Sequence, residues 1–287
     1  MALNPLFKQQ ALLANNGKVR VKKNYAKWLY PHSAQRTYER QLVALNRELS
    51  KVALDNVSPY LSNLVNEAKF ERGDSSKMKL DLSLVDSIKE ITRTTLFSYE
   101  SITNEQTLDQ IAGYQALAIA TYNKKQLVKV IQSAVGVNPI MSEPYLVPQI
   151  QLFQAENAAL IKKLSVEQAR RMEQTLFRNL SEGNGVKVIQ KELANNFDIG
   201  ENRARLIARD QTNKFNGSLA QLRQQNLGIG EYWWSGSLDE RERKTHLDNE
   251  GKHYSWGKPS PVTGHPGSQI RCRCTAQPII TDEMFLQ

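Results

Sequence analysis

The apolar residues of this chain recur at helical spacing over most of its length. After Pro31, Ser33 can cap a helix, and an apolar stripe then repeats every three or four residues until about Pro59. Its members are Tyr38, Leu42, Leu45, Leu49 and Val52. Such a stripe is the buried face of an amphipathic helix.

Similar stripes predict further helices. After a polar break at 71–77, Leu80, Leu84, Ile88 and Ile91 mark the next one. Asn104 can cap another helix that runs towards Val135, with Gly113 as its weak point. Three prolines in 136–148 then indicate a linker and a candidate domain boundary.

Three more helices are expected past the linker. The first carries Ile150, Phe153, Leu160 and Leu164. Ser165 and Gln168 have capping-box spacing at the head of the next, which glycines at 183–185 end. A short helix follows, and a last one opens near Asn202 and ends at Gly228.

The pattern changes at Gly228. The segment 231–235 (EYWWS) is typical of a strand, 248–252 of a tight turn, and 258–267 of a loop. The segment 268–276 (SQIRCRCTA) has the two-residue period of a second strand. The fold class is therefore α+β, a predominantly helical N-terminal body followed by a small α+β module. The predicted divisions are a basic arm at 1–32, a helical domain at 33–144, a helical segment at 145–227 and the module at 228–287.

Composition places the 287 residues among ordinary soluble proteins, since 40% are hydrophobic and 23% are charged. The first residues lack the apolar core of a signal peptide, and uncharged runs are too short and too polar to span a bilayer. We expect a soluble protein made in the cytosol, with no membrane partner.

Positive charge is concentrated in the N-terminal arm. The net charge is +9, and the first 60 residues hold ten lysines or arginines against three acidic residues. A basic arm suits double-stranded DNA, whose phosphates release counterions on binding; the alternative is a solvated tail. The aromatic residues Tyr25, Trp28 and Tyr30 can stack on bases or anchor the arm to a protein partner. The candidate nucleic-acid-binding residues are Lys18, Arg20, Lys22, Lys23 and Lys27.

Metal-binding residue types gather in the C-terminal module, where three of the four histidines and both cysteines lie between positions 246 and 274. Cysteines one residue apart on an extended strand are too widely spaced for an unstrained disulfide, and they share one face. With two of the three nearby histidines they can complete a tetrahedral zinc site. The candidate ligands are His246, His265, Cys272 and Cys274.

Two alternatives remain open for this cluster. The cysteines can be small buried hydrophobes packed on Trp233, Trp234 or Trp256, with the histidines as loop residues that form hydrogen bonds. Asp239 and His246 can also be cast as an acid/base pair.

Charged residues around the module favour a structural role. The run 239–246 (DERERKTH) is interpreted as an ion-pair network that locks a turn. The polar residues 210–212 interrupt an apolar helix stripe, and we expect them to bond to the module and fix helix to sheet. The candidate network residues are Arg209, Asp210, Asp239, Arg241 and Arg243.

In their order and spacing, these segments resemble the phage Mu F-like head morphogenesis proteins, which are minor head proteins of tailed bacteriophages. The matching pieces are IARDQT at 207–212, GIGEYWW at 228–234, DERERKTH at 239–246, NEGK at 249–252, HPG at 265–267 and CRC at 272–274. The helix around Tyr38 also resembles the opening of that family, whereas 74–144 matches nothing in it.

The resemblance implies a structural protein and not an enzyme. Its members bind the portal vertex and the capsid interior, assist head assembly and DNA packaging or ejection, and in some cases bind DNA without sequence preference. The implied location is the virion head, with host cytoplasm during assembly. The alternative function is a metal-dependent nuclease or hydrolase that uses the His/Cys cluster with Asp239 or Glu240.

Overall fold

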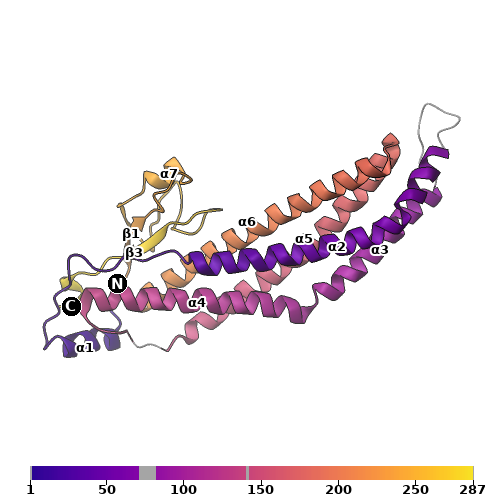
Figure 1. Ribbon diagram of the computed structural model, residues 1–287. Coiled ribbons are helices and arrows are strands. Elements are labelled where there is room, and N and C mark those ends of the chain that lie inside the picture. The colour runs from indigo at the N-terminus through magenta and orange to yellow at the C-terminus, as the bar shows by residue number, and fades with distance from the viewer. Residues whose placement is uncertain (1, 71–81, 140–141, 287) are drawn as a thin grey trace. The chain divides into compact units, whose positions relative to one another are not determined.

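The computed structural model describes residues 2–70, 82–139 and 142–286 (Figure 1). The longer helices are α1 (Pro5–Ala14), α2 (His32–Phe70), α3 (Leu82–Ile102), α4 (Glu105–Val135), α5 (Val147–Glu182) and α6 (Val186–Asn226). The shorter elements are η2 (Pro144–Leu146), β1 (Glu231–Ser235), α7 (Lys244–Leu247), β2 (His253–Ser255), β3 (Thr275–Pro278) and η3 (Asp282–Phe285). The predicted class, a helical body with a small α+β module, is confirmed. The expected break at 71–77 and Leu80 lie outside the described residues.

The chain divides into two compact units, each built from segments that are distant in sequence. Unit 1 comprises 1–36, 113–154 and 209–287, and unit 2 comprises 37–112 and 155–208. Helices α2, α4, α5 and α6 contribute residues to both units. Among the described residues, no helix has the length and apolar character that a membrane crossing requires.

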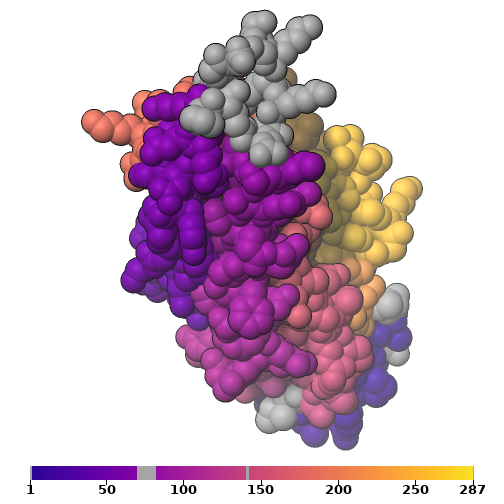
Figure 2. Space-filling view, turned by 90° about the vertical axis from the view of Figure 1, so that its right-hand side faces the viewer, coloured from indigo at the N-terminus to yellow at the C-terminus, as the bar shows by residue number. Residues whose placement is uncertain are grey.

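Unit 2 is held together by one large apolar core. The expected stripe on α2 is buried there: Tyr38, Leu42, Leu45 and Leu49 are at most 6% exposed, and Val52 packs beside them. Leu84 and Ile88 of α3 meet the same core, as predicted. Figure 2 shows the side chains of α2 and α3 packed directly against one another at the surface.

The predicted end of α2 near Pro59 is wrong, because the helix continues to Phe70. Proline within a helix removes one backbone hydrogen bond and costs about 3 kcal/mol. Val57, Leu61 and Leu64 lie on either side of Pro59 and are all buried in the core of unit 2. Burial of this continuous apolar face outweighs the lost hydrogen bond, so the helix does not end.

Two other predicted breaks are also absent. Ser165 does not cap a new helix, because its hydroxyl donates to the Lys162 carbonyl inside α5. Gln168 is buried and donates to the Ser50 hydroxyl (3.0 Å), so it packs α5 against α2. Similarly, α6 is one helix where two were expected, with Leu193 and Ala204 in one buried face.

Three other helix ends are where the sequence predicts them, whereas Ser33, predicted to cap a helix, lies inside α2. Asn104 caps α4 through a hydrogen bond from the Thr107 amide to its side-chain oxygen (2.9 Å). Gly183 and Gly228 follow α5 and α6 with φ of 76° and 80°, values that favour glycine. α4 passes through Gly113 without interruption.

Unit 1 contains the sheet, with strand order β2-β1-β3 and antiparallel pairing throughout. β1 is the strand expected at 231–235, and it buries Tyr232 and Trp234 on one face. The strand expected at 268–276 is mostly wrong, since only its last residues belong to β3. The preceding segment turns, because Arg271 has φ of 60° and the Cys272 amide donates to the Gln269 carbonyl (3.1 Å).

The N-terminal arm is part of unit 1 and not a free tail. Phe7 and Ala11 of α1 pack with Val130 and Ile131 of α4 in a second apolar core. The following extended segment reaches β3, where the Gln277 side chain accepts from the Trp28 amide (2.6 Å) and donates to a neighbouring carbonyl of the arm.

Candidate metal centre and basic strap

His246, Cys272 and Cys274 meet inside the C-terminal module. Their potential ligand atoms all lie within 4.8 Å of one another, and all three residues are buried. His246 comes from the short helix α7, and both cysteines come from the turn that leads into β3. A nitrogen and two sulfur atoms in this arrangement can hold a metal ion.

The imidazole of His246 is held from both sides. Its Nδ1 lies 3.3 Å from the Sγ of Cys274, and its Nε2 lies 2.9 Å from the Oε1 of Gln269. Arg243 donates to the same Gln269 oxygen (3.0 Å), which identifies that atom as an acceptor. Nε2 therefore carries the proton, and Nδ1 faces the thiols with its lone pair, as in metal sites where an outer residue orients the histidine.

The electrostatics of the cluster couple the two thiols. A hydrogen bond with Cys274 lowers the pKa of Cys272 to about 5; burial opposes this shift, while His246 and the Gly267 amide add to it. The same hydrogen bond, burial and the nearby Cys272 charge raise the pKa of Cys274 far above its usual range. A hydrogen bond with Cys272 raises the pKa of His246. The pair thus favours one thiolate and strongly resists a second one unless a cation is present.

His265, the fourth predicted ligand, is placed elsewhere. Its Nδ1 lies 2.9 Å from the Tyr232 hydroxyl, and its ring packs 5.0 Å from the ring of Trp256. His253 is also apart, since it pairs with Glu231 (3.1 Å) on the exposed side of the sheet. The structure therefore brings together three of the four residues predicted as ligands.

The cysteines also have the apolar surroundings of the alternative interpretation. Cys272 and Cys274 belong to a buried cluster with Tyr232, Trp234 and Trp256. The Trp234 ring meets the His246 ring edge-on at 5.7 Å. Packing on tryptophans and metal binding are compatible here, because both cysteines belong to the aromatic cluster and the Sγ of Cys274 also lies 3.3 Å from His246.

Two residues beside the cluster were missed by the sequence analysis. Gln269 orients His246, and the Oε1 of Glu242 accepts a hydrogen bond from the Sγ of Cys274 (3.2 Å). Gln269 lies in the segment 268–276, which was expected to be a strand. Glu242 is one of several charged residues in the run 239–246. Neither had a signal of its own, because both act only through long-range contacts.

Asp239 belongs to an ion-pair network and not to an acid/base pair with His246. Its carboxylate pairs with Arg273 through both oxygens and also accepts from the Arg241 amide (3.0 Å). The hydrogen bond with Arg273 is the largest cause that holds the pKa of Asp239 below its usual range. Arg243, another predicted member, instead donates to the side chain of Gln269 and to the Ile270 carbonyl.

The contact between α6 and the module uses residues that follow the predicted ones. Asp210 pairs with Lys214 (2.7 Å), and Arg209 is half-buried near it on the same helix. Asn213 donates to the Gly267 carbonyl (2.7 Å), and Gly217 leaves room for the backbone of Pro266.

Gln224 makes the most central of these contacts. Its side chain is fully buried, donates to the Ala276 carbonyl (2.9 Å) and accepts from the Trp256 indole (3.2 Å). The side-chain amide of Gln224 thus connects α6 with β3 and with the cluster that contains Trp256. This role was expected at 210–212, and Gln224 carries no local signal for it.

The five predicted nucleic-acid-binding residues share one exposed segment, which we call the basic strap (residues 18–27). All five side chains, those of Lys18, Arg20, Lys22, Lys23 and Lys27, are exposed. The strap backbone is fixed by hydrogen bonds from Val21 to the Asp282 carboxylate (2.7 Å) and from Lys22 to the Ala134 carbonyl (3.0 Å). The strap is therefore a positively charged surface in a defined conformation.

The aromatic residues next to the strap anchor it within its own chain. Trp28 is 1% exposed and Tyr30 is 6% exposed, so neither can stack on a nucleic-acid base. Tyr25 is half-buried and its hydroxyl donates to the Pro278 carbonyl (2.6 Å). Base stacking by Trp28 and Tyr30 is a wrong interpretation, since their rings fill the interior of unit 1.

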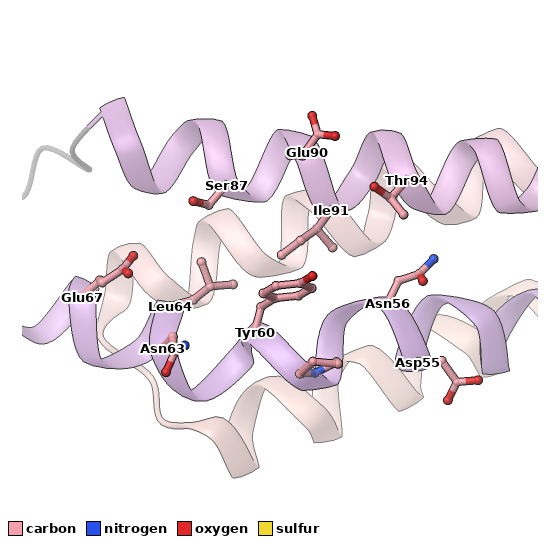
Figure 3. Close-up of a pocket in the computed structure, with 11 residues that line it drawn as sticks. Asp55, Asn56, Tyr60, Asn63, Leu64, Glu67, Ser87, Glu90, Ile91 and Thr94 are labelled. Carbon is pink, nitrogen blue, oxygen red and sulfur yellow. The ribbon is translucent and has the colours of Figure 1, made fainter.

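Unit 2 has a groove of its own between α2 and α3, shown in Figure 3. Tyr60 lies in it, more than half exposed, and Asp55, Glu67 and Glu90 give its lining a negative charge. Its lining contains no histidine, cysteine or basic residue. None of the predicted functional residues lies in this groove.

Comparison with known proteins agrees with the resemblance of the C-terminal segments. Residues 170–277 match the family model described as "Phage Mu protein F like protein". A protein of Haemophilus influenzae (strain ATCC 51907 / DSM 11121 / KW20 / Rd), described as "Uncharacterized protein", is 30% identical over 141 residues. That alignment covers 49% of this chain and 32% of the relative, so the chain spans about a third of the relative's length. No solved structure matches the chain.

Proposed function

We propose that this chain is a phage head morphogenesis protein, because residues 170–277 match the family model described as "Phage Mu protein F like protein". The family match is the observation that carries the proposal, since it spans all of α6, the strand β1 and both cysteines. The family suggests a structural component of the virion head and not an enzyme.

The proposed partners are the portal protein and the major capsid protein. The test is co-expression of the full chain with the portal protein of the same phage, followed by affinity purification of either one. A stable complex is expected. Portal assemblies that form normally and purify without this chain, both alone and from procapsids, would contradict the proposal.

The basic strap supports a further role in contact with packaged DNA. Its five cations project from a fixed backbone, so they can meet several phosphates together without ordering a flexible tail. Binding to double-stranded DNA should be independent of sequence and should weaken steeply with salt. In the proposed head protein this surface faces the DNA.

A charge-neutral variant tests the strap better than a deletion, because residues 1–30 also supply core side chains such as Phe7 and Trp28. Replacing all five strap cations by glutamine should weaken binding. It should also lower the dependence of log affinity on log salt by about one for each lost phosphate contact. The control replaces five exposed lysines of unit 2: Lys51, Lys69, Lys162, Lys187 and Lys191. Equal losses in both variants would remove the strap as the DNA contact.

We infer that the metal held by the His/Cys cluster is zinc and that its role is structural. Two thiolates and an imidazole are zinc ligands, and a module with so small an apolar cluster gains folding energy from such an ion. Elemental analysis of the purified protein should find about one zinc per chain. No bound metal, together with an unchanged fold after chelation, would refute this.

The alternative function, a metal-dependent nuclease or hydrolase, has one favourable observation. Only three of the predicted ligands meet, and catalytic zinc sites keep an open fourth position. A plasmid-nicking assay with zinc, magnesium or manganese separates the two functions. Turnover that His246→Ala abolishes would favour the enzyme, and no nicking under any of these conditions is expected for the structural protein.

A further inference from the structure

We propose that Glu242 is the fourth ligand of the metal centre, so that the site is a closed His/Cys/Cys/Glu site. The inference rests on the proposed zinc site and assigns a ligand that the sequence pattern did not suggest. The Oε1 of Glu242 lies 3.2 Å from the Sγ of Cys274, which is one of the three buried ligand atoms. Carboxylate oxygen is an established ligand of zinc beside sulfur and nitrogen.

The carboxylate of Glu242 is held in place but lacks a counterion. Its Oε2 accepts a hydrogen bond from the Leu238 amide (2.5 Å), where the chain turns with φ of 54°. Within the described part of the chain, Glu242 forms no ion pair, whereas the neighbouring Asp239 is paired with Arg273. A half-buried carboxylate without a cation beside a thiol is an arrangement that a bound divalent ion would neutralise.

The distances agree with a site that closes around an ion. Zinc binding releases the thiol protons to solvent, and the hydrogen bond from Cys274 to Glu242 is then lost. A thiolate and a carboxylate 3.2 Å apart would repel each other unless a cation lay between them. Bond lengths of about 2.3 Å to sulfur and 2.1 Å to oxygen give a tetrahedral edge of about 3.6 Å. Along the edge between Cys274 and Glu242, the required opening is therefore only a few tenths of an ångström.

The other residues that could supply a fourth ligand are already held by other contacts. The carboxylate of Asp239 is held by Arg273, and the ring of His265 is held by Tyr232 and Trp256. A site with two thiolates, one carboxylate and one zinc ion carries a net charge of −1.

Gly236 provides an independent way to move this ligand. A Cβ at Gly236 would lie 2.6 Å from the Oε1 of Glu242 and 2.9 Å from its Oε2. The carboxylate is the flexible end of a side chain, so Gly236→Ala would push it aside at little cost to the fold. All four ligating residues would remain in the chain.

The test compares the zinc affinity of the full-length wild type with that of Glu242→Gln and Gly236→Ala, by competition with a chromophoric chelator. Glu240→Gln is the matched control, because Glu240 is exposed, lies two residues away and loses the same charge. Zinc should bind about 10- to 100-fold more weakly to Glu242→Gln and at least several-fold more weakly to Gly236→Ala. Glu240→Gln should bind like the wild type.

Cobalt substitution supplies a readout that a merely structural role of Glu242 would not move. The visible spectrum of the wild type should be that of tetrahedral cobalt with two thiolates, and it should change in Glu242→Gln but not in Glu240→Gln. Unchanged affinity and spectrum in Glu242→Gln would overturn the proposal and indicate water at the fourth position. A wild type that binds no zinc would overturn both this inference and the zinc site. Neither result bears on the head role, which the portal experiment tests separately.

Discussion

Unit 2 and the C-terminal module at 228–287 are stabilised by different physical means. The core of unit 2 is a continuous set of buried aliphatic side chains from long helices, among them Leu42, Leu49 and Leu176. The module buries a small cluster of aromatic rings, two cysteines and an alanine. The module buries much less apolar area than unit 2, so apolar burial contributes less to its stability. Hydrogen bonds and ion pairs must therefore contribute more.

Those directional contacts converge on few residues. Gln224, Gln269 and Arg273 each bridge two or more segments of unit 1 through named hydrogen bonds or ion pairs. A core of many equivalent side chains loses stability gradually when it is altered, whereas a network of single contacts fails at particular positions. The following experiments test that difference.

The largest effect is expected from removing two of the proposed metal ligands. In Cys272→Ser/Cys274→Ser the module should lose its fixed aromatic packing, because both cysteines share one buried cluster with Trp234 and Trp256. Near-ultraviolet circular dichroism and tryptophan fluorescence should therefore change strongly, while far-ultraviolet helical signal from unit 2 is largely retained. Chelation of the wild type should reproduce the change, and an equal loss of helical signal would contradict independent stabilisation of the two regions.

A single truncation in unit 2 should have a moderate effect that spreads over its helices. Leu49 is fully buried in the α2 stripe, so Leu49→Ala should lower the free energy of unfolding of unit 2 by about 3 kcal/mol. Urea unfolding followed at the helical signal measures this. The exposed Leu82→Ala provides the control, since it removes the same atoms from the surface and should change little.

A smaller effect is expected at the buried amide that links α6 to the module. Gln224→Leu keeps the volume but leaves the Ala276 carbonyl and the Trp256 indole N–H buried without this partner. The free energy of unfolding should fall by about 2 kcal/mol. Backbone amides of β3 should exchange faster with solvent, before any change appears in unit 2. If the amides of β3 exchanged as slowly as in the wild type, the Gln224 side chain would not contribute importantly to the stability of β3.

The smallest change should be stabilising. Leu238 is exposed and adopts φ of 54°, a conformation that costs a non-glycine residue about 1 kcal/mol. Leu238→Gly removes that strain while the backbone amide that Glu242 accepts from remains. Thermal unfolding followed by tryptophan fluorescence should shift upward by a few degrees at most, and a downward shift would mean that the entropy lost by glycine dominates.

Much of the helical body could be predicted from the sequence, because its signals are local. The α2 stripe, the Asn104 cap and the glycines at 183 and 228 depend on neighbouring residues and appear where expected. The breaks expected at Pro59 and Ser165 were wrong, since tertiary burial of adjoining residues overrides a local stop signal. The pairing of segments into units 1 and 2 had no local signal either.

The candidate site could be predicted only in part for the same reason. His246, Cys272 and Cys274 are rare residue types in one short stretch, so composition alone pointed to them. The strand geometry invoked to join the cysteines was wrong, because Arg271 turns the chain and the turn, not a pleat, buries both sulfur atoms. Glu242 and Gln269 are common residues whose roles follow from three-dimensional proximity.

The hydrogen bonds between Gln277 and the N-terminal arm join two segments that the ribosome synthesises far apart in time. The amide of Trp28 receives its partner only after 249 further residues have been synthesised. At about 5–20 residues per second this takes roughly 12–50 s. Throughout that interval the Trp28 indole and the five strap cations are present in the growing chain, while the hydrogen bond from the Trp28 amide to Gln277 is still missing. A chain that stops short of β3 would keep the bond from Lys22 to Ala134 but lack those to Gln277 and Asp282, so the strap would be only partly fixed.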